Sequence, residues 1–270
     1  MSEFLYKQKK EEKNKIIQIS NNVFIGNQSK KVIIAGPCSI KSKQQLLDTA
    51  RILKAKGVNI MRAGAFKPRT SPYSFQGLEE EGLNILIEVK KEIGIPVITE
   101  ITDEKYLEKY IENIDIIQVG SKNMFNYELL KKLGKTNKPI LLKRAMSAAY
   151  KEWLLAAEYI MSFGNENVIL CERGIRTFET ETRNTLDIQA IPYIKNNSRL
   201  PIIVDPSHAC GNRYMIKPLA LAAIISGADG IMIESELDPE EAVSDKEQTI
   251  DIDELSEIIN NVEQISNLQV

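Results

Sequence analysis

Basic side chains recur directly after short apolar runs along this chain. The set consists of Arg62, Lys67, Arg69, Lys122, Lys143 and Arg173. An ionised group at the end of a buried strand is costly unless an opposite charge compensates it. Guanidinium and ammonium groups gathered at one place suit phosphates and carboxylates. Because the formal net charge of the whole chain is only −2, we interpret the set as a local pocket for small polyanions, not as a nucleic-acid surface.

A second set of residues combines a thiol, the chain's single imidazole and two carboxylates. Its members are Cys38, His208, Glu234 and Asp245. Such mixed donors suit Zn²⁺, Mn²⁺, Fe²⁺ or Co²⁺ better than Mg²⁺ or Ca²⁺. No two of them have the close spacing of a zinc motif, so the prediction depends on their positions after apolar runs. A lone histidine can also be a structural polar residue, and the pattern leaves that alternative open.

The elements that must position both sets alternate regularly. Short β-branched runs occupy residues 32–35, 59–62, 97–100, 116–119, 140–143, 168–171, 202–205 and 230–234. Stretches with helical periodicity lie between or after them, for example 44–56, 78–93, 127–133, 148–163 and 255–265. The alternation predicts an α/β protein, a (β/α)8 TIM barrel. An open doubly wound sheet shares the pattern, but no G-x-G-x-x-G follows the first run.

The same sequence pattern indicates how the chain is organised. Residues 16–27 alternate around Ser20-Asn21-Asn22, which predicts a β-hairpin. We therefore expect residues 1–30 to form an N-terminal extension with this hairpin and residues 31–270 to form one catalytic barrel. Three cysteines, no apolar signal segment and no run long enough for a bilayer favour a cytoplasmic protein. In a barrel both chemical sets would meet at one mouth.

The strand ends also resemble a known family. The stretches IIAGPCSI, MRAGAFKPRTSPYSFQGL, QVGSKNMFN, PILLKRAMSA, CERGIRTFETETRNTLD, VDPSHACGNR and GIMIESE are similar to those of the 3-deoxy-D-arabino-heptulosonate 7-phosphate (DAHP) synthases. The resemblance covers nearly all of residues 17–262 and fits the compact microbial branch without a regulatory domain. It implies a metal-dependent transferase that condenses phosphoenolpyruvate with erythrose 4-phosphate, giving 3-deoxy-7-phosphoheptulonate and phosphate at the first step of the shikimate pathway to aromatic amino acids.

The resemblance also implies roles for individual residues. Cys38, His208, Glu234 and Asp245 match metal ligands, and Arg62, Lys67, Lys122, Lys143 and Arg173 match the groups that hold phosphoenolpyruvate. Arg69, Thr70 and Ser71 match the loop that receives erythrose 4-phosphate. Glu100, Gln118 and Asp205 are expected among the polar groups of the substrate pocket. Glu100 and Gln118 would order water there or support the residues that bind substrate and metal. Lys67 is the expected proton donor to the aldehyde oxygen, with Cys38 and His208 acting through the metal.

Two further expectations concern assembly and regulation. The family and the apolar hairpin favour a homodimer or homotetramer. Relatives that respond to aromatic amino acids carry an added domain of about 70 residues or a chorismate mutase segment, and neither is recognisable here. We therefore expect weak or no inhibition by phenylalanine or tyrosine.

Three other readings of the sequence remain open. A 3-deoxy-D-manno-octulosonate 8-phosphate synthase shares the fold and phosphoenolpyruvate but accepts arabinose 5-phosphate; the KPRTS loop favours the heptulosonate reaction over it. A Schiff-base aldolase could use Lys143 as its nucleophile, although the neighbouring cations suit phosphate binding better. A degenerate barrel that only binds a partner would not need the complete set of proposed ligands.

Overall fold

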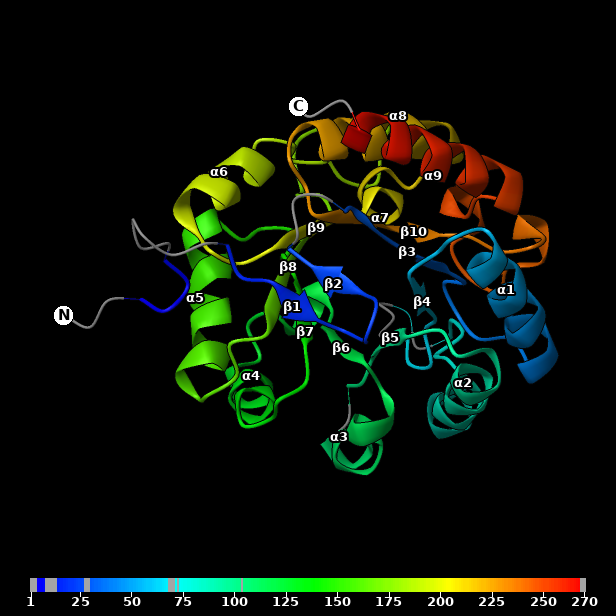
Figure 1. Ribbon diagram of the computed structural model, residues 1–270, viewed down its shortest axis with the longest axis horizontal. Coiled ribbons are helices and arrows are strands. Elements are labelled where there is room, and N and C mark those ends of the chain that lie inside the picture. The colour runs from blue at the N-terminus through cyan, green and yellow to red at the C-terminus, as the bar shows by residue number, and fades with distance from the viewer. Residues whose placement is uncertain are drawn as a thin grey trace.

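The computed structural model describes residues 4–7, 14–26, 30–67, 71, 73–102 and 104–267. Parallel strands close into a barrel in the order β10-β3-β4-β5-β6-β7-β8-β9, which confirms the predicted (β/α)8 fold (Figure 1). The strands are β3 (Val32–Gly36), β4 (Ile60–Arg62), β5 (Val97–Glu100), β6 (Ile116–Val119), β7 (Ile140–Lys143), β8 (Val168–Glu172), β9 (Ile202–Val204) and β10 (Gly230–Glu234). Each expected apolar run forms a strand, so buried β-branched runs were a sufficient signal.

Helices surround the barrel. They are α1 (Lys43–Ala55), α2 (Glu79–Ile93), α3 (Glu104–Tyr110), α4 (Tyr127–Gly134), α5 (Tyr150–Ser162), α6 (Ala190–Asn197), α7 (Pro206–Cys210), α8 (Arg213–Ile225) and α9 (Ile252–Asn267). The stretches named from periodicity correspond to α1, α2, α4, α5 and α9. Of the helices not named there, α8 contains Pro218 in its interior, a residue that ordinarily argues against a helix. None of the helices in the described ranges has the length and apolar character needed to cross a bilayer.

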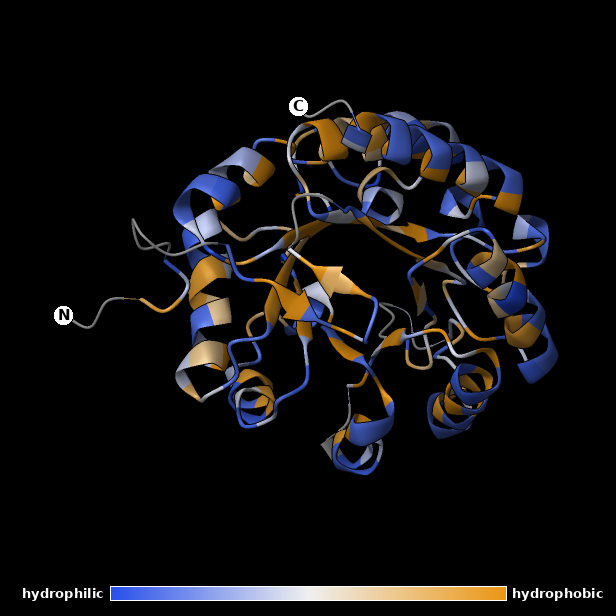
Figure 2. Cartoon of the chain, viewed as in Figure 1, coloured by the Kyte–Doolittle hydropathy of each residue, from blue (hydrophilic) through white to orange (hydrophobic). Residues whose placement is uncertain are grey.

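Two hydrophobic clusters divide the core. The larger one fills the space between the barrel and its helices and includes the fully buried Trp153. The smaller one lies among side chains such as Ile34, Ile98 and Leu141 of the strands. Along the strands the ribbon is mostly hydrophobic, whereas the helices alternate between hydrophobic and hydrophilic residues (Figure 2).

The expected hairpin is present and belongs to the smaller cluster. Strands β1 (Ile17–Gln18) and β2 (Phe24–Ile25) pair antiparallel and cross the barrel in the view of Figure 1. Ile17 and Ile25 are buried with the strand residues of that cluster. Ile17 and Ile25 are covered by the barrel, whereas Ile16 and Phe24 of the same segment are 53% and 37% exposed. The expected homodimer or homotetramer stays a prediction.

The strands end where their character changes from apolar to charged. In register, Glu234 of β10 lies beside Gly36 of β3, and Glu100 of β5 lies beside Gln118 of β6. Gly36 has φ +147°, and a Cβ there would lie 2.2 Å from the backbone oxygen of Arg62. The close approach of β3 to β4 therefore depends on glycine. It brings the residues after β3 next to the end of β4.

Candidate active site

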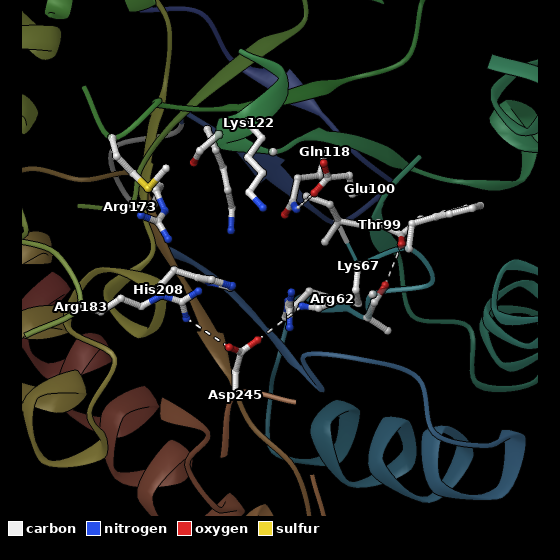
Figure 3. Close-up of a pocket in the computed structure, with 18 residues that line it drawn as sticks. Arg62, Lys67, Thr99, Glu100, Gln118, Lys122, Arg173, Arg183, His208 and Asp245 are labelled. Atoms are coloured by element: carbon white, nitrogen blue, oxygen red, sulfur yellow. Dashed lines mark hydrogen bonds and ion pairs between the residues drawn. The ribbon is translucent and has the colours of Figure 1, made fainter. Parts of the chain in front are cut away.

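A cavity of about 180 Å³ opens among the strand ends (Figure 3). Its polar lining consists of Arg62, Lys67, Thr99, Glu100, Gln118, Ser121, Lys122, Lys143, Arg173, Arg183, His208 and Asp245. Every basic residue of the predicted set lines it except Arg69, which lies outside the described residues together with Thr70. Residues far apart in the sequence thus meet at one mouth, as a barrel requires.

Three potential metal donors lie together at one side of this cavity. One ligand atom from each of Cys38, His208 and Glu234 lies within 4.8 Å of the other two. Cys38 follows β3, His208 lies in α7, and Glu234 ends β10. Cys38 is fully buried and Glu234 is 1% exposed. A thiol, an imidazole and a carboxylate at this spacing form a donor set that fits a divalent transition metal.

The orientation of His208 supplies an independent test of that fit. Its Nδ1 lies 2.8 Å from Asp205 Oδ2, and burial lowers the pKa of His208 to about 4 against the opposing effect of Asp205 and Glu234. The neutral ring therefore donates from Nδ1 to the carboxylate. Its Nε2 is then an acceptor and lies 3.3 Å from Glu234 Oε1. With Nε2 and Oε1 both acceptors, the pair has the arrangement that a bound divalent cation would stabilise.

Asp205 lies behind the cavity and not on its surface. It caps the N-terminus of α7, where its Oδ1 accepts the backbone N–H of His208 at 3.0 Å. Its Oδ2 also lies 2.5 Å from Lys143 Nζ. Burial would raise the pKa of Asp205, but His208 and Lys143 hold it well below its usual range. The carboxylate therefore fixes one donor of the metal cluster and one cation of the pocket.

Asp245 approaches the cluster from the loop after β10. Cys38 Sγ donates to Asp245 Oδ2 at 2.9 Å, and Lys67 Nζ donates to Cys38 Sγ at 2.8 Å. Burial would raise the pKa of Asp245, but Lys67 and the Cys38 hydrogen bond keep it far below its ordinary value. Its left-handed backbone, with φ 56°, is uncommon for a residue other than glycine. The loop therefore holds Asp245 in a special conformation beside the thiol.

Two buried guanidinium groups in the pocket are incompletely satisfied. Arg62 Nη1 donates to Pro37 O at 2.8 Å and to Glu234 Oε1 at 2.9 Å. Arg62 Nε and Arg173 Nη1 have no hydrogen-bond partner within the described part of the chain. Burial lowers the pKa of Arg173, a residue that is only 6% exposed. Buried donors of this kind call for an acceptor, and an anion fits best.

Glu100 lies beside Gln118 and across the cavity from Arg173 and Arg183 (Figure 3). Gln118 Nε2 donates to Glu100 Oε2 at 3.2 Å, and Asn123 Nδ2 lies 3.5 Å from Oε1. A Cβ on Gly120 would lie 2.5 Å from both carboxylate oxygens. The glycine of the QVGSK stretch therefore leaves the space that this carboxylate occupies.

Comparison with known proteins agrees with this geometry. Residues 12–269 match the model of the DAHP synthetase I family. The chain is 48% identical, over 93% of its length and 72% of the relative's, to "phospho-2-dehydro-3-deoxyheptonate aldolase" of Thermotoga maritima. The chain belongs to the DAHP synthetase I family.

Two other relatives define its place among these proteins. The crystal structure of the Thermotoga maritima DAHP synthase superposes with a TM-score of 0.93 at 46% identity, covering 98% of this chain and 77% of that one. A "2-dehydro-3-deoxyphosphooctonate aldolase" of Geobacter sulfurreducens is 32% identical over 90% of this chain and 95% of its own. The resemblance recognised from the strand ends is thereby confirmed at the level of the family.

Some residues named from the sequence lie away from the cavity. Asp205 supports His208 and Lys143 from below, as described above. Ser71 is exposed and accepts the backbone N–H of Tyr73 at 3.3 Å. The two other cysteines also lie away from the cavity: Cys171 is buried in the barrel interior and Cys210 is buried in α7.

Thr99 and Ser121 of the cavity lining were not identified from the sequence, and neither were two polar residues that lie farther from the strand ends. Arg183 lines the cavity from the loop between β8 and α6, and Gln248 lies buried behind Glu234 in the loop between β10 and α9. Neither directly follows a strand, which was the signal used. For Arg183 the available indication was its place in CERGIRTFETETRNTLD, one of the stretches that resemble the family.

Proposed function

We propose that this chain condenses phosphoenolpyruvate with erythrose 4-phosphate in the presence of a divalent metal, giving 3-deoxy-7-phosphoheptulonate and phosphate. In the first new bond, C3 of phosphoenolpyruvate joins the aldehyde carbon of the acceptor. Water adds at C2, a proton goes to the aldehyde oxygen, and the bond from C2 to the phosphate oxygen breaks. Phosphate leaves with the electron pair, so the reaction consumes one water and needs no oxidant.

The observation that carries this proposal is the buried Arg173 guanidinium, with a donor unsatisfied by any described residue, beside a thiol–imidazole–carboxylate cluster. A set of metal-binding residues alone would fit many hydrolases. Buried cations alone would fit any phosphate-binding protein. Together, at one barrel mouth, they suit a reaction in which an anionic substrate must be held against a polarised carbonyl.

The binding roles follow from position in the pocket. Arg173, Lys143 and Lys122 would hold the phosphate and carboxylate of phosphoenolpyruvate, and Arg62 would hold it next to the donor cluster. Arg69, Thr70 and Ser71 are proposed for the acceptor phosphate by family resemblance. Lys67, whose ammonium contacts Cys38, would give the proton to the aldehyde oxygen. Burial would lower the pKa of Lys67, but its interactions with Cys38 and Glu234 raise it, which favours the protonated form of this donor.

Cys38, His208, Glu234 and Asp245 would hold the metal, with Mn²⁺, Fe²⁺, Co²⁺ or Zn²⁺ compatible with their donor atoms. A bound ion would supply a Lewis acid for the aldehyde oxygen or for water. The residues around it have their own tasks. Asp205 keeps Nε2 of His208 unprotonated, and Arg62 balances the charge of Glu234.

The test is a phosphoenolpyruvate-consumption assay with metal-stripped protein. Mn²⁺ is added back, and erythrose 4-phosphate or arabinose 5-phosphate is offered in parallel. The proposal predicts turnover that needs the metal and the four-carbon sugar. Silence with both sugars in folded, metal-loaded protein would refute it.

The same assay addresses the octulosonate alternative. Similarity to the Geobacter sulfurreducens octonate aldolase, at 32% identity, keeps arabinose 5-phosphate as the second candidate acceptor. The greater identity of 48% to the Thermotoga maritima heptonate aldolase favours erythrose 4-phosphate. Preference for the five-carbon sugar would reassign the acceptor and leave the proposed phosphoenolpyruvate and metal sites in place.

A Schiff-base mechanism receives less support from the contacts of Lys143. Its Nζ lies 2.5 Å from Asp205 Oδ2 and the side chain is 5% exposed. A nucleophilic amine must be unprotonated and free to attack a carbonyl, whereas this one is paired with a buried carboxylate. Borohydride trapping of substrate on Lys143 is the outcome that would favour the aldolase.

A further inference from the structure

We infer that Gln248 is a positioning residue that holds the Glu234 carboxylate toward the metal and links it to Arg183 of the substrate pocket. The inference rests on the proposed function, since it concerns the metal site of that reaction. Gln248 belongs to the short helix η4 (Lys246–Gln248) in the loop after β10. It is 2% exposed and does not line the cavity.

The amide of Gln248 joins two groups of opposite charge. Its Nε2 donates to Glu234 Oε2 at 2.6 Å, and its Oε1 accepts from Arg183 Nη1 at 2.7 Å. A carboxylate can only accept and a guanidinium can only donate. The orientation of the amide is therefore fixed by its partners, and turning it over would lose both hydrogen bonds.

This contact decides which oxygen of Glu234 faces the donor cluster. Oε2 is occupied by Gln248, while Oε1 accepts from Arg62 and lies 3.3 Å from His208 Nε2. Without the amide, the carboxylate could rotate or approach a metal through either oxygen. Groups that orient a metal ligand in this way raise metal affinity by about 10- to 100-fold.

The other half of the amide connects the metal site to the substrate side. Arg183 Nη1 also lies 3.2 Å from Asp245 Oδ1, and Arg183 lines the cavity beside His208 (Figure 3). The Arg183 guanidinium thus contacts one proposed metal ligand, Asp245, directly, and it reaches another, Glu234, through Gln248. The loop between β8 and α6 is thereby tied to both carboxylates of the site.

The experiment measures Mn²⁺ affinity in the absence of substrates, by competition with a chromogenic chelator. Gln248→Met keeps the length of the side chain and removes both hydrogen bonds. We expect it to weaken Mn²⁺ binding by about 10- to 100-fold. Gln248→Glu places a carboxylate against Glu234 while keeping an acceptor for Arg183, and should be at least as damaging at neutral pH.

Gln45 offers a matched control, because its partner Glu236 lies two residues after Glu234. Gln45 Nε2 donates to Glu236 Oε2 at 3.1 Å, so Gln45→Met removes the same kind of contact without touching Glu234. It should leave Mn²⁺ affinity unchanged within about twofold. Arg183→Met should weaken binding less than Gln248→Met, and the double variant should be less damaging than the product of the two effects, because the contacts form one chain.

The outcomes separate this inference from the proposed function. Folded Gln248→Met and Gln248→Glu proteins, judged by a cooperative melting transition and a parental circular-dichroism spectrum, that bind Mn²⁺ like the parent would overturn the positioning role. Equal losses in Gln248→Met and Gln45→Met would do the same, since the effect would then be general. Lack of turnover by the parent protein would refute the proposed reaction alone, because the affinity measurement uses no substrate.

Discussion

Asp205 Oδ2 lies 2.8 Å from His208 Nδ1, and His208 Nε2 in turn lies 3.3 Å from Glu234 Oε1. The tautomer of the proposed metal ligand is thus set by a carboxylate that never reaches the cavity. Asp205→Asn replaces the acceptor with an amide that can donate toward Nδ1 and so favours the proton on Nε2. We expect Mn²⁺ affinity to fall by about 10- to 100-fold, as measured by chelator competition.

The control for this variant is a second buried aspartate. Asp229 is 1% exposed, accepts from Ile202 N and Lys195 Nζ at 2.8 Å each, and precedes β10 at the opposite end of the barrel strand. Asp229→Asn should lower the melting temperature while leaving Mn²⁺ affinity unchanged. An Asp205→Asn protein with parental affinity would show that the tautomer is fixed by something else.

The pH dependence of metal binding follows from Cys38. Burial raises the pKa of this thiol to about 12, with Glu234 adding to the effect and Lys67 opposing it. A ligating thiolate must lose this proton, so apparent affinity should rise about tenfold per pH unit across the neutral range. His208, whose pKa burial lowers to about 4, is already neutral there and adds nothing to the slope.

Chelator competition between about pH 6 and pH 8.5, corrected for the titration of the chelator, gives the slope directly. A value near one proton per ion supports Cys38 as the ligand that ionises. In Cys38→Ala the slope should approach zero and the affinity should be lower. A parental slope near zero would mean that metal binding does not deprotonate the thiol.

The pair formed by Lys143 and Asp205 should show strong coupling in stability. Both side chains are nearly inaccessible, at 5% and 1% exposure, with Nζ and Oδ2 2.5 Å apart. Lys143→Met leaves a buried carboxylate without its cation, which costs about 3–5 kcal/mol. In the double variant with Asp205→Asn the carboxylate is gone as well, so the loss should be smaller than the sum of the two single losses. Urea denaturation of the four proteins measures this, and additive losses would contradict the pairing.

The barrel and much of the site could be predicted from the sequence, because both depend on local signals. A buried strand is an apolar run, and the residue after it, such as Arg62 or Lys143, is marked by a sudden charge. Arg183 and Gln248 lie 11 and 14 residues beyond the ends of β8 and β10, in loops whose path is set only by tertiary contacts. That these two residues contact Asp245 and Glu234 could not be inferred from the sequence without that path.

The role of Asp205 could be predicted only in part from the sequence. The sequence suggested the end of a strand at 202–205, but β9 ends at Val204 and Asp205 caps the helix Pro206–Cys210. Aspartate at the N-cap followed by proline at the first helical position is a known helix start. A carboxylate used in this way points toward its own helix, which explains why it supports His208 and does not line the pocket.

The hairpin offers a test of how the barrel is closed at its amino-terminal end. Ile25 is fully buried against strand residues of the barrel interior, while its neighbour Phe24 is 37% exposed on the other face of the same strand. Ile25→Ala removes buried methyl groups and leaves a cavity, which costs about 2–5 kcal/mol. Phe24→Ala, at a side chain that is more than one-third exposed, should cost less than Ile25→Ala. Urea denaturation compares the two, and because neither residue reaches the catalytic mouth, turnover per folded molecule should stay at the parental value. Equal and small losses in both variants would mean that Ile25 is covered but contributes little to the stability of the core.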